Sequence, residues 1–207
     1  MPIIWVTGDT HGDWIHRVNM DSFPEQREMS KDDYVIILGD FGIWRDSPQQ
    51  RWYLNWLEEK HFTTLFIDGN HENYDILDSY PVEEWHGGKV HFIKPSIIHL
   101  MRGQVFDIDG LKFFTFGGAA SHDISDGVLE IDDPRVKEWR DDPDKMYRIN
   151  HISWWEREMP NQEEMDEGIK NLAEHNNKVD FILTHCTASS TAALLSHGLY
   201  KPDKLTN

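Results

Sequence analysis

Three clusters of potential metal ligands stand in the first half of the chain. The first contains Asp9 and His11, the second Asp40, and the third Asn70 next to His71. Asp9 and His11 are two positions apart, so on an extended segment both side chains point the same way and can bind one cation. Oxygen and imidazole ligands together suit manganese, iron or zinc better than calcium. These residues therefore predict a transition-metal site.

A second cation is compatible with the same residues. The carboxylate of Asp40 has two oxygens and can bridge two metals, and His185 offers another imidazole nitrogen. Two metals about 3.5–4 Å apart can clamp a phosphoryl group while a nucleophile displaces its leaving group in line. The residue types thus favour a hydrolase of phosphate esters.

Each cluster follows an apolar run that is typical of a strand. Such runs occupy residues 3–6, 34–38 and 63–68, and a fourth, 178–185, ends in His185. Strands that alternate with helices form parallel sheets, in which the strand ends converge on one edge. We therefore expect the ligand clusters to share one pocket.

The segments between these runs also have recognisable patterns. Ser47 followed by proline predicts the start of a helix whose apolar stripe contains Trp52, Tyr53, Trp56 and Leu57. Residues 161–177 have helical periodicity that predicts a buried face with Met165, Ile169 and Leu172. Short apolar runs over 90–116 indicate antiparallel sheet, with a hairpin turn at 107–110. Residues 117–160 are rich in glycine, proline and aspartate and are predicted to form an elaborated loop or lid.

The motifs GDTHGD, GDFG, GNHE and LTHC resemble successive blocks of the calcineurin-like metallophosphoesterase superfamily, and they occur in that family's order. The resemblance covers residues 7–186. It implies an α/β fold in which a sandwich of two mixed β-sheets is flanked by helices. It also implies two divalent metal ions, with Mn²⁺ as the first choice and Fe or Zn as alternatives. We expect one domain over 1–207, since 39% hydrophobic residues suffice for one core.

The resemblance also implies a role for each matching residue. Asp9 and His11 are expected at the first metal and Asn70 and His185 at the second, with Asp40 bridging both. His71 matches the catalytic imidazole, and Glu72 is expected to anchor its turn. In the implied reaction, a hydroxide held between the metals attacks phosphorus and His71 acts as general acid on the leaving oxygen.

The sequence departs from the family pattern in two places. Asp40 is not followed by the rest of GDxxDR, so the arginine that binds phosphate has no match. Arg45 and Arg102 are the candidates to substitute, with a surface ion pair as the alternative role of either. His122 in GGAASHD is a candidate for substrate contact, with an ordinary loop position as the alternative. The terminal GHxH block is also absent from the sequence. We therefore expect that a C-terminal segment is missing and that this chain binds its metals weakly.

The charge balance narrows the choice of partners. The chain has 20 basic and 37 acidic side chains, a net charge of −17. This field repels long nucleic acids, whereas bound cations would still admit a small phosphorylated substrate or a phosphoprotein. One alternative function is a phosphodiesterase or nuclease for short nucleotides, in which Trp154 and Trp155 stack on bases. Another is an inactive, metal-poor binding or regulatory protein.

The sequence predicts a cytoplasmic protein without membrane contact. No apolar stretch is long enough to span a bilayer, and the first strand begins without a preceding signal segment. Cys186 is the single cysteine, which suits a reducing compartment.

Overall fold

In the largest sheet of the described residues, the carboxyl ends of the predicted strands lie next to one another. The computed structural model describes residues 1–199, and this sheet has six strands. In spatial order they are β1 (Ile4–Gly8), β2 (Tyr34–Leu38), β3 (Thr63–Ile67), β6 (Ile97–Leu100), β5 (Gly88–Lys94) and β4 (Val82–Trp85). The strands β1, β2, β3 and β6 are parallel, whereas β5 and β4 are antiparallel to their neighbours. The loops after β1, β2 and β3 therefore meet.

A second, smaller sheet is also mixed. Its strands are β11 (Phe181–Thr184), β8 (Leu111–Phe116) and β7 (Gln104–Ile108), with β11 parallel and β7 antiparallel to β8. The predicted hairpin turn joins β7 to β8, and both Asp109 and Gly110 have positive φ, as a two-residue turn of this kind requires. The strands expected over 90–116 are thus divided between two sheets, because β6 pairs with β3 rather than with β7.

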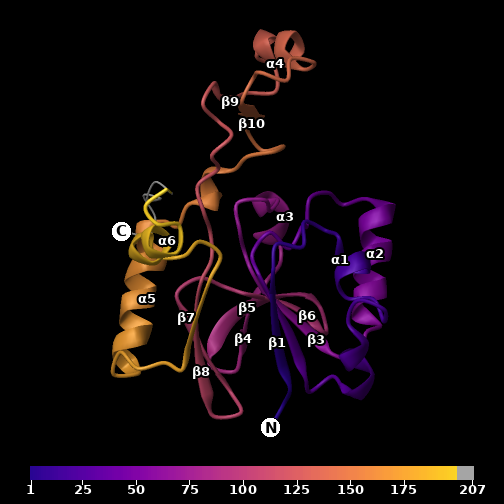
Figure 1. Ribbon diagram of the computed structural model, residues 1–207, viewed down its shortest axis with the longest axis vertical. Coiled ribbons are helices and arrows are strands. Elements are labelled where there is room, and N and C mark those ends of the chain that lie inside the picture. The colour runs from indigo at the N-terminus through magenta and orange to yellow at the C-terminus, as the bar shows by residue number, and fades with distance from the viewer. Residues whose placement is uncertain (200–207) are drawn as a thin grey trace.

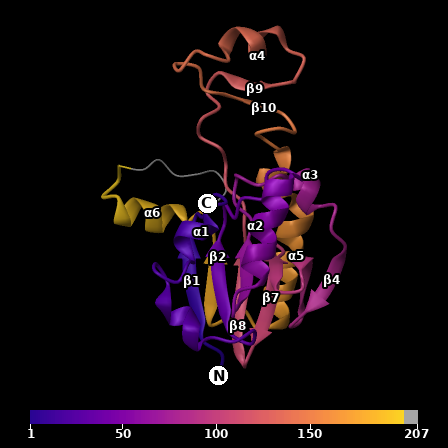
Figure 2. The same cartoon turned by 90° about the vertical axis from the view of Figure 1, so that its right-hand side faces the viewer.

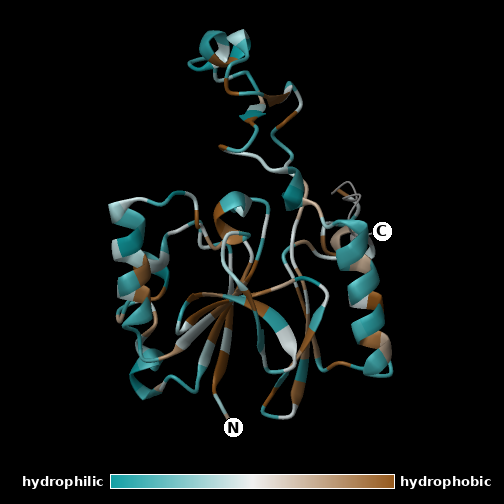
Figure 3. Ribbon diagram, turned by 180° about the vertical axis from the view of Figure 1, so that it is seen from behind, coloured by the Kyte–Doolittle hydropathy of each residue, from teal (hydrophilic) through white to brown (hydrophobic). Residues whose placement is uncertain are grey.

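The two sheets pack face to face, with helices on their outer sides (Figure 1). One buried cluster, which includes Ile36, Leu65 and Phe106, lies between the sheets. A second cluster fills the space between the six-stranded sheet and three helices. These helices are α1 (Trp14–Arg17), α2 (Pro48–Glu58) and α3 (Tyr74–Leu77). Figure 3 shows hydrophobic residues concentrated on the strands and hydrophilic ones on the helices. The predicted fold class, a sandwich of two mixed sheets flanked by helices, is confirmed.

Helix α2 begins as the sequence predicts. The Ser47 side chain accepts a hydrogen bond from the backbone N–H of Gln50, and Pro48 occupies the first turn. Leu54 and Leu57 are buried against the sheet. Trp52, which shares the predicted apolar stripe, is instead 56% exposed.

Helix α5 (Gln162–Glu174) packs on the smaller sheet with Gly168 at the contact. A Cβ added at Gly168 would lie 3.3 Å from the Gly103 Cα and 3.4 Å from the Phe114 ring, so this side of the helix faces the sheet. Ile169, predicted to lie on the buried face, is 68% exposed as a consequence. The helix begins with a capping box between Asn161 and the third helical residue.

Residues 117–160, here called the arm, project from one end of the sandwich (Figures 1 and 2). The arm contains β9 (Gly127–Leu129), α4 (Pro134–Trp139), β10 (Tyr147–Ile149) and the 3₁₀ helix η2 (Glu156–Glu158). β9 and β10 pair in parallel to form a third small sheet. The arm is thus more ordered than the irregular loop that its glycine and proline content predicts.

The remaining elements are η1 (Pro24–Glu28), a 3₁₀ helix, and α6 (Ser189–Leu195), which follows β11. None of the helices within residues 1–199 combines the length and the apolar character needed to cross a membrane.

A buried row of polar side chains crosses the six-stranded sheet. His91 and His99 approach through their Nδ1 atoms at 3.2 Å, and the Nε2 of His99 is 3.1 Å from a carboxylate oxygen of Asp68. Asp68 in turn accepts hydrogen bonds from Arg102 and Tyr74. Burial lowers the pKa of His91 to about 4, and the neighbouring His99 adds to this effect. His91 is therefore uncharged in the folded protein at neutral pH.

We expect the protein to lose stability as the pH falls from about 6.5 to about 4. In this range the unfolded chain protonates His91, whose ordinary pKa is 6.5, while the folded chain does not. The loss attributable to His91 is about 2 kcal/mol at pH 5. Urea denaturation at pH 7 and pH 5 measures it. In His91→Gln the difference between the two pH values should shrink; an unchanged difference would exclude His91 as its source.

Candidate metal centre

Asp9, His11 and Asp40 form the core of the candidate site. One potential ligand atom from each lies within 4.8 Å of the others, and the Nε2 of His11 is 3.5 Å from the Asp40 carboxylate. All three residues have left-handed backbones, with φ of 29°, 45° and 49°. This conformation is uncommon for residues other than glycine and tends to occur where function requires it. The loops after β1 and β2 thus bring three potential ligand atoms, two from carboxylates and one from an imidazole, close to one point.

His185, at the end of β11, approaches this cluster from the second sheet. Its Nδ1 lies 2.8 Å from the Leu38 carbonyl and its Nε2 lies 3.5 Å from Asp40. Donation from Nδ1–H to the carbonyl leaves Nε2 as the free ligand, which is the usual arrangement of a metal-binding histidine. Only glycine fits at position 39, since a Cβ there would lie 2.2 Å from the His185 ring.

Asn70 is oriented by the arm. Its side-chain nitrogen donates to the Ser121 hydroxyl at 3.2 Å, and Ser121 donates to the Glu158 carboxylate at 2.7 Å. The amide oxygen of Asn70 is therefore free to act as a ligand. Gly69 permits the close approach of this turn, because a Cβ there would lie 2.1 Å from the Asp40 carboxylate. No local pattern in the sequence indicates these roles of Ser121 and Glu158.

His71 lies beside the cluster. Its backbone N–H donates to Asp40 at 2.9 Å, and its ring packs edge-on against the His11 ring with centroids 5.1 Å apart. Burial lowers the pKa of His71; the Asp40 carboxylate opposes this shift, whereas Arg148 and His11 add to it.

Glu72 anchors the same turn, as predicted. Its buried carboxylate accepts hydrogen bonds from the backbone N–H groups of Phe41, Gly42 and Ile43. Burial raises the pKa of Glu72 to about 8, although these N–H groups favour the ionised form. Glu72 thus ties the loop after β3 to the loop after β2.

Arg148 of β10 connects the arm to His71. Its guanidinium nitrogens lie 3.4 Å and 3.2 Å from the two ring nitrogens of His71. Two further hydrogen bonds go to the Asp123 carboxylate, and one goes to the Ser153 carbonyl. Arg148 cannot be recognised from the sequence, because nothing in its local sequence distinguishes it from the other basic residues of the arm. Only the fold of the arm brings it to the site.

The predicted site residues lie in three different places, which are two neighbouring cavities and, for Arg102, a buried polar cluster. A cavity of about 1120 Å³, here called the carboxylate cavity, is lined by all the predicted metal ligands together with His71 and His122. Arg45 lines a neighbouring cavity of about 460 Å³. These placements are compatible with the predicted roles of the ligands, which stay predictions. The oxygen and imidazole donors around Asp40 fit a divalent transition metal.

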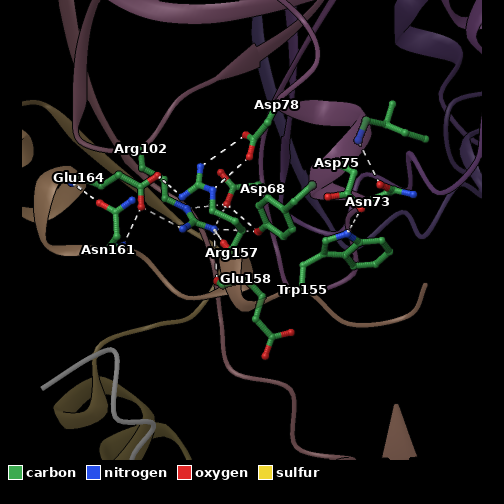
Figure 4. Close-up of polar contacts among 12 residues, drawn as sticks. Asp68, Asn73, Asp75, Asp78, Arg102, Trp155, Arg157, Glu158, Asn161 and Glu164 are labelled. Carbon is green, nitrogen blue, oxygen red and sulfur yellow. Dashed lines mark hydrogen bonds and ion pairs between the residues drawn. The ribbon is translucent and has the colours of Figure 1, made fainter. Parts of the chain in front are cut away.

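Arg102 requires a correction, because its guanidinium is not available to substrate. It is only 4% exposed, and it donates to Asp68, Tyr74 and Glu164. Figure 4 shows it inside a polar cluster with Arg157, at the point where the arm returns to the sandwich. The positive charge of Arg102 neutralises the buried Asp68 and not a phosphoryl group.

The two tryptophans of the nuclease hypothesis do not form an open stacking platform. Trp155 is buried and donates its indole N–H to Asp75, and Trp154 donates its own to Glu158. Trp155 fastens the arm to the sandwich, whereas the contact of Trp154 lies within the arm. A strand of nucleic acid therefore finds no exposed aromatic pair here.

Comparison with known families is consistent with this geometry. A family model described as calcineurin-like phosphoesterase matches residues 3–193. No curated protein matches the chain, and no solved structure does so. The matched range includes every residue of the candidate metal centre.

Proposed function

Because the chain belongs to the calcineurin-like phosphoesterase family, we propose that it hydrolyses phosphate esters with the help of two divalent metal ions. The observation that carries this proposal is the convergence of Asp9, His11 and Asp40 at adjacent strand ends, beside His71. Asn70 and His185 complete the ligand set. Manganese is the first choice of metal, since carboxylate and amide oxygens outnumber imidazoles among these ligands.

The residues of the chain divide the reaction between them. Divalent cations held by Asp9, His11, Asp40, Asn70 and His185 would supply the nucleophile at neutral pH and neutralise charge on the phosphoryl oxygens. The His71 ring donates an N–H to the leaving oxygen, which takes a proton as its bond to phosphorus breaks. The attacking water supplies the new P–O bond. Overall, ester and water give an alcohol and phosphate.

We assign Arg148 to the phosphoryl group. Its bidentate contact with Asp123 holds the guanidinium beside His71, and in this proposal the N–H groups that face the His71 ring bind phosphoryl oxygens. In this proposal Arg148 substitutes for the arginine of GDxxDR. His122 lines the same cavity and is a second candidate for substrate contact.

The proposed substrate is a small phosphorylated molecule or a phosphoprotein, and the proposed location is the cytoplasm. The net charge of −17 supports a substrate of limited charge over a long polyanion. The single cysteine suits a reducing compartment.

Replacing His71 with alanine tests the proposed function. We expect kcat for a model ester to fall by about 10²–10⁴, because the leaving oxygen loses its proton donor. Metal content should not change, since His71 is not a ligand in this proposal. The measurements are hydrolysis with added Mn²⁺ and elemental analysis after dialysis.

His61→Ala is the matched control, because His61 is exposed and lies in the turn before β3. It should leave both the rate and the metal content as they are. Hydrolysis that His71→Ala does not slow would overturn the assignment of His71. Assaying a monoester and a diester side by side decides between the phosphatase and phosphodiesterase readings.

A further inference from the structure

The aromatic cavity, as we call the space of about 460 Å³ that Arg45 lines, adjoins the carboxylate cavity. His71 and Arg148 line both. A substrate whose phosphoryl group lies at the metal ligands and whose leaving oxygen lies at His71 can therefore continue into the aromatic cavity. Its volume falls within the range of about 300–1,000 Å³ that is usual for small-molecule sites.

Rigid aromatic rings form much of the wall of this cavity. Trp14 and Trp155 are buried, and both donate their indole N–H groups within the protein, Trp14 to the Phe41 carbonyl and Trp155 to Asp75. Tyr53 on α2 also lines the cavity, where its hydroxyl accepts a hydrogen bond from Gln49. Trp14 and Trp155 are only 1% and 5% exposed and so form the rigid backing of the wall, whereas Trp44 and Tyr53 supply the ring surface that a ligand can reach. A wall supported in this way can contact a ligand without a large cost in conformational entropy.

Trp44 connects this wall to the catalytic group. Its indole N–H donates to the His71 carbonyl at 2.9 Å, and its backbone N–H donates to the Gln50 side chain at 3.1 Å. The same Gln50 oxygen accepts from the backbone N–H of Arg45 at 3.0 Å. The loop between β2 and α2 is thus pinned in the position that places Trp44 and Arg45 on the cavity.

The cavity carries positive charge on a strongly acidic protein. Arg45 supplies this charge, since it makes no ion pair within residues 1–199, whereas Arg148 on the arm side is paired with Asp123. A ligand with an aromatic ring and hydrogen-bond acceptors fits this cavity. Its ring can stack on the aromatic side chains, and its acceptors can receive hydrogen bonds from the guanidinium groups. A small aliphatic alcohol would leave the aromatic surface uncovered.

We propose that the aromatic cavity binds the alcohol part of the substrate, and that this part carries a planar aromatic ring. The inference rests on the proposed function for its orientation, with the phosphoryl group at the metal ligands. Aryl and nucleoside esters share the required chemistry. Trp44, Tyr53 and Arg45 are then residues that determine specificity.

The test compares 2-phenylethyl phosphate with butyl phosphate. Both are esters of primary alcohols, so their leaving oxygens have similar reactivity and the ring is the main difference. With Mn²⁺ present, kcat/KM should be at least about tenfold higher for the phenyl ester. Ligand-observed NMR in EDTA, where no hydrolysis occurs, should show the same preference in Kd.

Trp44→Leu should bring both preferences, the ratio of kcat/KM and the ratio of Kd between the two esters, close to one. Trp5→Leu is the matched control, because Trp5 is 42% exposed against 43% for Trp44 and does not line the cavity; it should leave both preferences unchanged. Equal binding of the two esters, or equal effects of the two substitutions, would overturn the inference. Selective binding without hydrolysis would refute the proposed function and leave the cavity assignment standing.

A second pair of compounds identifies the source of the ring. A nucleoside 5′-monophosphate is compared with ribose 5-phosphate in the same two assays. If the nucleotide is preferred over ribose 5-phosphate by a larger factor in kcat/KM and Kd than the phenyl ester is over the butyl ester, the ring is a nucleobase. A smaller factor indicates an aryl ester.

Discussion

Asp40→Asn is expected to remove metal binding and hydrolysis together while the fold is retained. Asp40 lies between His11 and His185, and its two carboxylate oxygens are each 3.5 Å from one of these imidazoles. An asparagine amide offers one oxygen and no negative charge, so neither metal keeps an adequate ligand set. The rate should fall to that of the metal-free protein.

The fold should survive this substitution for two reasons. Asparagine tolerates the left-handed backbone that Asp40 adopts, and its oxygen can still accept the hydrogen bond from the His71 backbone. Elemental analysis after dialysis against Mn²⁺, together with circular dichroism, measures both outcomes. Asp13→Asn is the control, because Asp13 belongs to the same GDTHGD motif but its exposed carboxylate contacts His16. Full metal retention in Asp40→Asn would refute its bridging role.

Arg102→Met is expected to cost about 3–5 kcal/mol of stability, a large part of the total for a typical domain. Burial raises the pKa of Asp68, but the Arg102 charge and the hydrogen bond from His99 outweigh burial and bring it well below its usual range. Without Arg102 the buried carboxylate loses its principal counter-charge. The carbonyls of Arg157 and Glu158 lose a donor at the same time.

Urea denaturation measures this loss, and two further variants interpret it. Arg135→Met removes an exposed pair with Asp133 and should cost less than about 1 kcal/mol. Adding Asp68→Asn to Arg102→Met should recover part of the stability, because no buried charge is then left unpaired. If the double variant is no more stable than Arg102→Met, the cost comes from packing and not from the charge on Asp68.

The sequence was informative where neighbouring residues determine the geometry. The clusters at Asp9, Asp40 and Asn70 could be placed together because each follows a strand of a parallel sheet, and the turn at Asp109 and Gly110 has local chemistry of its own. Ser47 likewise marks the start of α2 through a contact with a residue three positions away. These features need no knowledge of distant segments.

The two arginines show where such reasoning fails. Arg102 follows a strand near the site, yet its guanidinium turns to Asp68 and to the returning arm. Arg148 lies 77 positions from His71 and reaches it only because the arm folds back. Ile169 was misplaced for a similar reason, since Gly168 sets the face on which α5 packs. Each outcome depends on long-range packing that a local pattern does not encode.

At the proposed ligands Asp9, His11 and Asp40, left-handed backbones set thermal stability against the proposed catalysis. Glycine adopts this conformation without steric cost, so a glycine there relieves strain but removes a proposed ligand. Laboratory evolution under thermal selection alone would thus tend to remove the proposed metal centre. A screen for more thermostable variants of this protein must therefore also select for catalytic activity in every round.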